Sequence, residues 1–288
     1  MILDYTVAQK AILDPSVRLA DYDQITPEAA EVLARGYRRA KVEPVHLIVP
    51  TTVTLYSLDL AGLRDLDPGT AATLAGWNPI AERDCGDETV CSLLLDGVQN
   101  PSAESLRALS RWEASCASAT LSLEGLRTLT VEQARVLSVW YGANLFNSLN
   151  LSGVEDLSDL ATVELARWSG EELTLGLPAL TVGVARALST WRGQTLALPK
   201  LTQLDGDSAQ ALIRLTPDGQ SETPGANATW EGLWECLVIG GPKRIGGITP
   251  KVADWITELR MVGVEVVLSP ESEQAVQENS TYSSKPKL

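Results

Sequence analysis

The chain has 288 residues, of which 44% are hydrophobic, and this is enough to bury the core of one large or two ordinary domains. Its 37 acidic and 23 basic residues give a formal net charge of -14. That charge repels nucleic-acid phosphates and anionic lipid heads, and no stretch approaches the roughly 20 apolar residues of a membrane span. The composition therefore predicts neither a nucleic-acid partner nor a membrane partner.

A sequence pattern recurs in register along most of the chain, beginning with a weak copy that keeps only the second half of the pattern, at residues 17–36. The copies that follow end in tryptophan, except the last, which has leucine there; they lie at residues 57–77, 92–112, 121–140, 148–168, 173–191 and 196–215. Clear repeats thus cover 57–215, and a last degenerate copy is expected at about 237–267. Such internal repetition predicts stacked units and a single domain over residues 1–269.

Each copy opens with two leucines separated by one residue, a period of two that predicts a short strand with one buried face. The pairs are Leu58/Leu60, Leu93/Leu95, Leu121/Leu123, Leu149/Leu151, Leu173/Leu175 and Leu196/Leu198. A helix-start residue follows, for which the candidates are Asp67, Thr130, Ser158, Thr181 and Thr249. The helix is about three turns long, and its Ala, Leu and Trp at spacing three predict one inward stripe.

Glycine stands two residues after the tryptophan in three copies, at Gly142, Gly170 and Gly193. At that position we expect left-handed residues that end the helices. The segments between the tryptophan and the next strand vary in length and are long at 78–92, 113–120 and 141–148. In a stack of repeats such insertions collect along a single edge, where binding functions are often added.

Because one unit cannot enclose its own leucines, the units are expected to stack strand on strand and helix beside helix, with the narrower strands on the concave side. The pattern resembles the leucine-rich-repeat family, and especially a bacterial variant reading LxLxxLxxLxxxxAxxLxxWxG. The resemblance implies an α/β solenoid of about seven to eight irregular repeats, right-handed, with parallel strands on one side and short helices on the other. The usual asparagine of the family is replaced here by Leu63, Val98, Leu126, Val154, Leu177 and Leu201.

The remaining segments carry weaker predictions. Residues 216–236 form an insertion rich in Gly, Pro, Ser and Thr, in which Trp230 and Trp234 lie at helical spacing and either seal the end of the stack or serve as a binding anchor. The polar residues 270–288 are expected to be a disordered tail. No secretion signal precedes the repeats, which favours the cytoplasm, or an extracellular location if a leader was removed.

Four cysteines, at 85, 91, 116 and 236, lack the paired spacing of a zinc site. Cys85 and Cys91 could close a small disulfide loop in an oxidising compartment, whereas free thiols are expected in a reduced one. The single histidine, His46, lies in an apolar segment without a nucleophile motif. Asp205 and Asp207 are read as a helix start in preference to a calcium site, and the glycines of 240–247 as turns in preference to a phosphate loop.

The tryptophans of the repeats share their register with buried Ala and Leu, so we interpret them as core in preference to a sugar-stacking surface. The outward positions of the strands are small, hydroxylated or acidic, and they are the main candidates for a binding surface. They are Asp59, Asp96, Ser122, Glu124, Asn150 and Thr174, together with Ala61, Leu94, Ser152 and Ala197. A surface of this kind fits a basic protein partner, or is merely a solvated face of the sheet.

The leading hypothesis is therefore a non-enzymatic protein-interaction module without cofactor or metal, which uses the strand face and the insertion edge near Cys85, Cys91 and Cys116. One alternative is a structural subunit that self-associates through its ends, near Trp230 and Trp234. A remote alternative is a hydrolase that uses His46.

Overall fold

The computed structural model describes residues 1–38, 40–46, 50–80, 89–143, 145–212, 236–239, 248–261 and 263–281. Its strands are β1 Ile2–Leu3, β2 Gln24–Ile25, β3 Ala40–His46, β4 Pro50–Asp59, β5 Thr89–Leu94, β6 Ser118–Ser122, β7 Thr128–Leu129, β8 Phe146–Leu151, β9 Asp156–Leu157, β10 Glu172–Leu175, β11 Thr195–Leu198, β12 Cys236–Ile239 and β13 Glu265–Val267. Its helices are α1 Tyr5–Leu13, α2 Pro27–Gly36, α3 Pro68–Leu74, α4 Ala103–Leu109, α5 Val131–Leu137, α6 Asp159–Leu165, α7 Val182–Leu188, α8 Gly206–Ala211, α9 Pro250–Met261 and α10 Pro270–Asn279, with a 3-10 turn at Leu19–Asp21.

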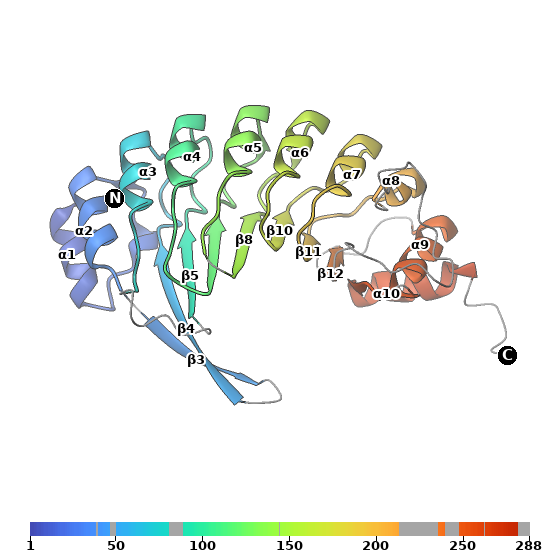
Figure 1. The fold of residues 1–288 in the computed structure, drawn as a ribbon, viewed down its shortest axis with the longest axis horizontal. Helices are drawn as coiled ribbons and strands as arrows, with labels where there is room; N and C mark the ends of the chain where they lie inside the picture. Colours follow the sequence, from blue (N-terminus) through green and yellow to red (C-terminus); the bar gives the residue numbers. More distant parts are fainter. Residues whose placement is uncertain are drawn as a thin grey trace.

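Nine of the described strands form one sheet in the order β13-β12-β11-β10-β8-β6-β5-β4-β3. All neighbours in it are parallel except β3 and β4, which form an antiparallel hairpin. Thr54 to Asp59 of β4 pair with β5, so the first residues of β4 pair only with β3. The hairpin therefore extends beyond the rest of the sheet (Figure 1).

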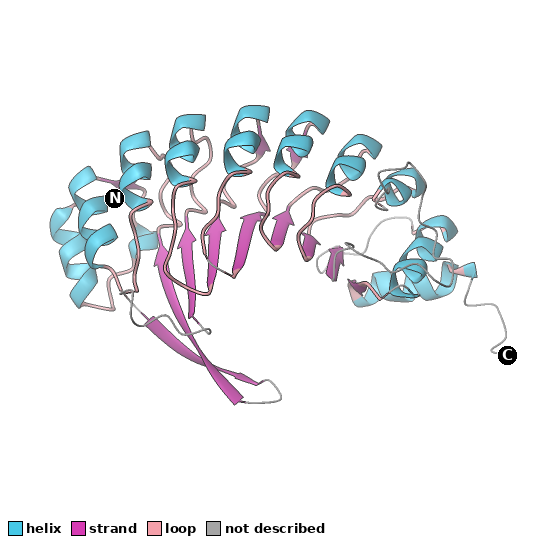
Figure 2. Cartoon of the chain, in the orientation of Figure 1, coloured by secondary structure: helices cyan, strands magenta, loops and turns pink. Residues whose placement is uncertain are grey.

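From β4 to α8 the strands of the large sheet alternate with helices, and the helices lie in a row along the outer, convex side while these strands lie along the inner side (Figures 1 and 2). The short strands β7 and β9 precede α5 and α6 and pair with each other in a separate sheet. This arrangement confirms the predicted α/β class, with mostly parallel strands. The predicted helix starts are also observed, since the side chains of Asp67, Thr130, Ser158 and Thr181 each accept a backbone amide of the first turn. No described helix is long and apolar enough to cross a membrane.

The core is built from the repeated leucines, both members of every predicted pair being completely buried. Behind them the five repeat tryptophans form a continuous stack, with ring centroids 5.9–6.2 Å apart and planes within 20° of parallel. All five are at most 1% exposed, as the interpretation of them as core predicts. Each aromatic ring thus joins one unit to the next.

Hydrogen bonds run along the same stack. The indole nitrogen of each tryptophan donates to a backbone carbonyl of the preceding unit: Trp77 to Tyr37, Trp112 to Trp77, Trp140 to Trp112 and Trp168 to Trp140, at 2.8–3.1 Å. Within the described part of the chain, the buried indole nitrogen of Trp191 has no acceptor. The stack therefore supplies directional bonds between units as well as buried area.

The prediction that Gly142, Gly170 and Gly193 adopt a left-handed conformation is wrong. Among the glycines that the structure describes, only Gly263 has a positive φ, of 92°. The three glycines are needed because a tryptophan ring lies against each of them: an added Cβ would come within 1.9–2.3 Å of Cζ2 of Trp140, Trp168 or Trp191. Their role is close packing and not backbone handedness.

A second column of glycines lies where each strand turns toward its helix. An added Cβ at these positions would come within 1.7–2.4 Å of a backbone carbonyl oxygen of the preceding unit; the positions are Gly62, Gly97, Gly125, Gly153 and Gly176. Neighbouring turns therefore pack backbone on backbone, which only glycine allows.

The prediction of a disordered tail from residue 270 is wrong for residues 270–279, which form α10. Ser269 caps this helix, and Ala275 and Val276 are buried. Arg260 of α9 binds both carboxylate oxygens of Glu273, at 2.7 and 2.6 Å, which ties α10 to α9. Helix α10 was not predicted because it is polar overall and its few buried residues do not form a clear hydrophobic pattern.

Candidate functional site

The candidate binding residues lie at the ends of neighbouring strands. Asp59 is the last residue of β4, Ser122 is the last of β6, and Asp96 and Glu124 follow β5 and β6 by two residues. Asn150 in β8 is aligned with Ser122 on one side and with Thr174 of β10 on the other. The sheet thus places all six predicted residues along one end of its inner face.

Hydrogen bonds join four of these six residues, Asp96, Ser122, Glu124 and Asn150, into one group. The Asp96 carboxylate accepts from the Ser122 hydroxyl at 2.5 Å and from the backbone amide of Glu124 at 3.1 Å. The side-chain amide of Asn150 donates to the Glu124 carboxylate at 2.7 Å. Asp59 accepts from the amide of Ala61 at 3.1 Å. These bonds hold the carboxylates at the strand ends without neutralising them.

Burial raises the pKa of the Asp96 carboxyl above its ordinary value of 3.8, and repulsion from Glu124 and Asp59 raises it further. The hydrogen bonds from Ser122 and Glu124 oppose this shift but do not reverse it. No ion pair among the described residues involves any of the three carboxylates. We call Asp59, Asp96 and Glu124 the carboxylate cluster.

Two of the predicted residues differ from expectation in their surroundings. Ser122 was predicted to be exposed, but it is 2% exposed because its hydroxyl is turned onto Asp96. Thr174 is half-buried and lies beside Asn150, one strand beyond the last residue bonded to the cluster. Ser122 is therefore a supporting residue, and the accessible surface is made mainly by the carboxylates and Asn150.

Two further rows of the inner face were missed in the sequence. The first, the hydroxyl row, is aligned across four strands and consists of Ser57, Ser92, Thr120 and Ser148. The second, the apolar row, lies two residues earlier on each strand and consists of Leu55, Val90 and Phe146, with Ser118 between the last two. The period-two pattern extends from the leucine pairs into these residues, so continuing it toward the strand starts would have placed them on the inner face, although it does not show which of them are aligned.

The insertion edge offers less than predicted. Cys91 and Cys116 are buried, at 0% and 1% exposure, so neither can contact a partner. A hydrogen bond between the two thiols lowers the pKa of Cys116, and the Cys116 thiol also donates to the Ser118 carbonyl at 3.0 Å. Cys85, and with it the predicted Cys85–Cys91 disulfide, lies outside the described residues.

The other candidates contribute no assembled site. His46 ends β3, but its side chain is outside the described part of the chain, as are Trp230, Trp234 and the glycines of 240–247. Asp205 caps α8 by accepting the amides of Asp207 and Ser208, as its interpretation as a helix start predicts. The residues that the structure describes contain no group of three His, Cys, Asp or Glu side chains placed to hold a metal ion.

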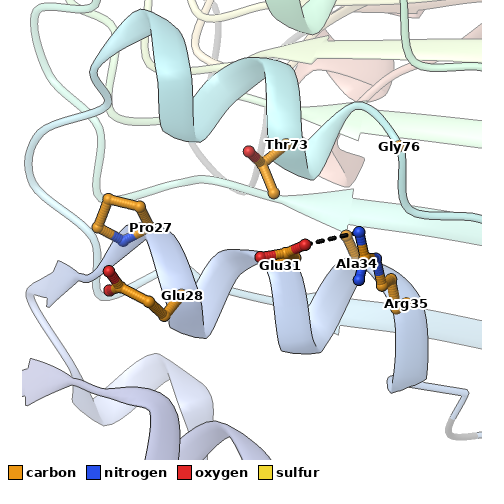
Figure 3. Close-up of a pocket in the computed structure, with 7 residues that line it drawn as sticks. All are labelled: Pro27, Glu28, Glu31, Ala34, Arg35, Thr73 and Gly76. Carbon is orange, nitrogen blue, oxygen red and sulfur yellow. Dashed lines mark ion pairs between the residues drawn. The ribbon is translucent and has the colours of Figure 1, made fainter.

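A recess lies between α2 and α3 on the helical side of the molecule (Figure 3). It is lined by Pro27, Glu28, Glu31, Ala34, Arg35, Thr73 and Gly76. Glu31 and Arg35, which are one turn apart on α2, form an ion pair of 2.6 Å within it. Two of the three charged side chains in the recess thus neutralise each other, which leaves it less acidic than the carboxylate cluster.

No protein-family model matches the sequence, and no curated protein matches it significantly. We therefore infer function from the surface of this chain.

Proposed function

We propose that the chain is a leucine-rich-repeat-like solenoid of about seven to eight irregular, right-handed repeats that acts as a non-enzymatic protein-interaction module. The parallel strand order, the stacked tryptophans and the glycine columns support a stack of repeated units. A right-handed course is the rule for a strand, helix and parallel strand that follow each other in one sheet.

The partner is a basic protein that docks on the inner face of the sheet. The observation that carries this proposal is the carboxylate cluster: three acidic side chains share one end of the face, and the part of the chain that the structure describes supplies no cation to them. A Lys or Arg of a partner would offset the repulsion that Glu124 and Asp59 exert on Asp96. Such charge complementarity favours rapid and selective association.

The test is affinity capture with the purified chain as bait, followed by mass spectrometry. One bait carries Asp59→Asn, Asp96→Asn and Glu124→Gln, which remove three charges and keep the hydrogen-bond acceptors. The matched control carries Asp65→Asn, Glu104→Gln and Asp156→Asn, which make the same change of net charge at exposed positions outside the cluster. A specific partner that is lost from the first bait and kept by the control supports the proposal; equal retention by both contradicts it.

A further inference from the structure

The apolar row, the hydroxyl row and the carboxylate cluster follow one another along the strands of the inner face, and they differ in chemistry. The apolar row of Leu55, Val90 and Phe146 lies toward the strand starts and is half-buried, and Leu145 beside Phe146 is 64% exposed. The hydroxyl row follows, and the carboxylate cluster lies at the strand ends. The face therefore changes from apolar to acidic over the length of a single strand.

We propose that the segment bound on this face is a cationic amphipathic helix that lies across β4, β5, β6 and β8. This inference builds on the proposed function and specifies the shape and the chemistry of the partner. The apolar stripe of the helix contacts the apolar row, and its Lys or Arg stripe contacts the carboxylate cluster. The mode is that of an amphipathic helix bound by its apolar side, with charge added along one flank.

The width of the face fits a helix. Leu55 and Asp59 are four residues apart on β4, which is a separation of about 13 Å. Asp96 and Glu124 lie two residues farther along the chain than Leu94 and Ser122, which are aligned with Asp59. A helix with its side chains is about 10–12 Å across, so it fills the distance between the apolar row and Asp59, and a long Lys or Arg side chain extends from it toward Asp96 and Glu124. The small side chains of Ser57, Ser92, Thr120 and Ser148 lie between the apolar row and the carboxylate cluster and leave room for the body of the helix.

The spacing along the rows also favours a helix over an extended peptide. Neighbouring strands are about 4.8 Å apart, close to the 5.4 Å pitch of an α-helix, so that each helical turn lies over one strand. An extended peptide places a side chain on one face about every 6.8 Å, so within two strands its side chains no longer lie over the strands. Four strands correspond to about three turns, enough for apolar residues at i, i+4 and i+7.

The charge of the face decides the sign of the flanking stripe. Glu124 and Asp59 each repel Asp96, and the ion pair of Arg135 with Glu164, for example, lies on the helical side and not at this cluster. An acidic or neutral amphipathic helix would leave this repulsion in place. Leu94, which is half-buried and aligned with Asp59, adds an apolar contact beside the carboxylate cluster. It carries no charge and so does not alter the preference for a cationic helix.

The test uses fluorescence anisotropy at low ionic strength with a labelled amphipathic peptide of leucine and lysine, about 18 residues long, or five helical turns. A scrambled peptide of the same composition is the control for charge alone. The protein variants are the neutralised carboxylate cluster, a Leu55→Thr/Phe146→Thr pair for the apolar row, and a control pair, Leu160→Thr/Val163→Thr, on α6. Leu160 and Val163 are 69% and 44% exposed on the helical side. Circular dichroism and thermal unfolding verify that each variant folds.

We expect the amphipathic peptide to bind at least about tenfold more tightly than the scrambled one, and each inner-face variant to weaken its binding about tenfold, which is 1.4 kcal/mol. The α6 pair should bind as the unaltered protein does. The inference is overturned if the amphipathic peptide does not bind, if the scrambled peptide binds equally well, or if the apolar-row pair has no effect. If only the neutralised carboxylate cluster weakens peptide binding, the amphipathic helix is contradicted and the proposal of a basic partner is kept. If no variant changes peptide binding, both proposals are contradicted.

Discussion

The indole nitrogen of Trp140 donates a 3.1 Å hydrogen bond to the backbone carbonyl of Trp112, and the two rings are stacked with centroids 6.0 Å apart. The same relationship joins Trp112 to Trp77 and Trp168 to Trp140. One side chain per unit therefore makes both the apolar and the polar contact with its neighbour. We expect this stack to hold the sheet in the shape on which the inner face depends.

Trp140→Phe should lower the free energy of unfolding by about 2 to 4 kcal/mol, because it removes the hydrogen bond to Trp112 and leaves a cavity between two packed rings. Val139→Ala is the control at the adjacent residue, which is 69% exposed, and it should change stability by less than about 0.5 kcal/mol. Urea unfolding followed by circular dichroism gives both values. Similar losses for the two variants would mean that the stack is not a main source of stability.

Gly153→Ala should be destabilising by about 1 to 3 kcal/mol, since its Cβ would lie 1.7 Å from the Glu124 carbonyl oxygen and the two turns would have to separate. Gly206→Ala is the contrasting change, because the atoms that it meets belong to the flexible Lys251 side chain, which can move aside. Thermal unfolding of both variants measures the difference. A Gly153→Ala protein as stable as Gly206→Ala would show that the turns are not closely packed.

The leucine pairs and the tryptophans were predictable from the sequence because burial in a strand or a helix leaves a simple period. The turn glycines were not predicted, although Gly62, Gly97 and Gly125 are visible in the aligned copies. Their role comes from contact between successive units, which no pattern within one unit shows. The same holds for Gly142, whose packing against Trp140 was mistaken for a backbone requirement.

The candidate site was predicted in part for a related reason. Alternation along each strand placed Asp59, Asn150 and Thr174 on one face. It could not show that Ser122 is turned onto Asp96, or that Leu55, Val90 and Phe146 are aligned, because that alignment depends on the register between strands. The hairpin of β3 and β4 was also missed, since its prolines weakened the strand pattern.

Asp96→Asn should stabilise the protein at neutral pH. The pKa of Asp96 is raised in the folded state, so the folded protein favours the protonated carboxyl, and stability falls as the pH rises from the ordinary value of 3.8 through the raised one. Asparagine carries no charge and can still accept from Ser122 and Glu124. Denaturant unfolding across this pH range should show that the free energy of unfolding of the variant increases relative to that of the unaltered protein as the pH rises. A variant that is less stable than the unaltered protein at neutral pH would contradict the raised pKa of Asp96.

Carboxyl footprinting measures whether a partner docks on the inner face at the carboxylate cluster. The captured partner is added to the chain, the carboxylates are modified with a carbodiimide and an amine, and the modification is quantified for each residue by mass spectrometry. We predict that labelling of Asp59 and Glu124 falls on binding, while that of Asp65, Glu104 and Asp156 is unchanged. If binding lowers the labelling of Glu104 or Asp156 and leaves that of Asp59 and Glu124 unchanged, the partner does not dock at the carboxylate cluster.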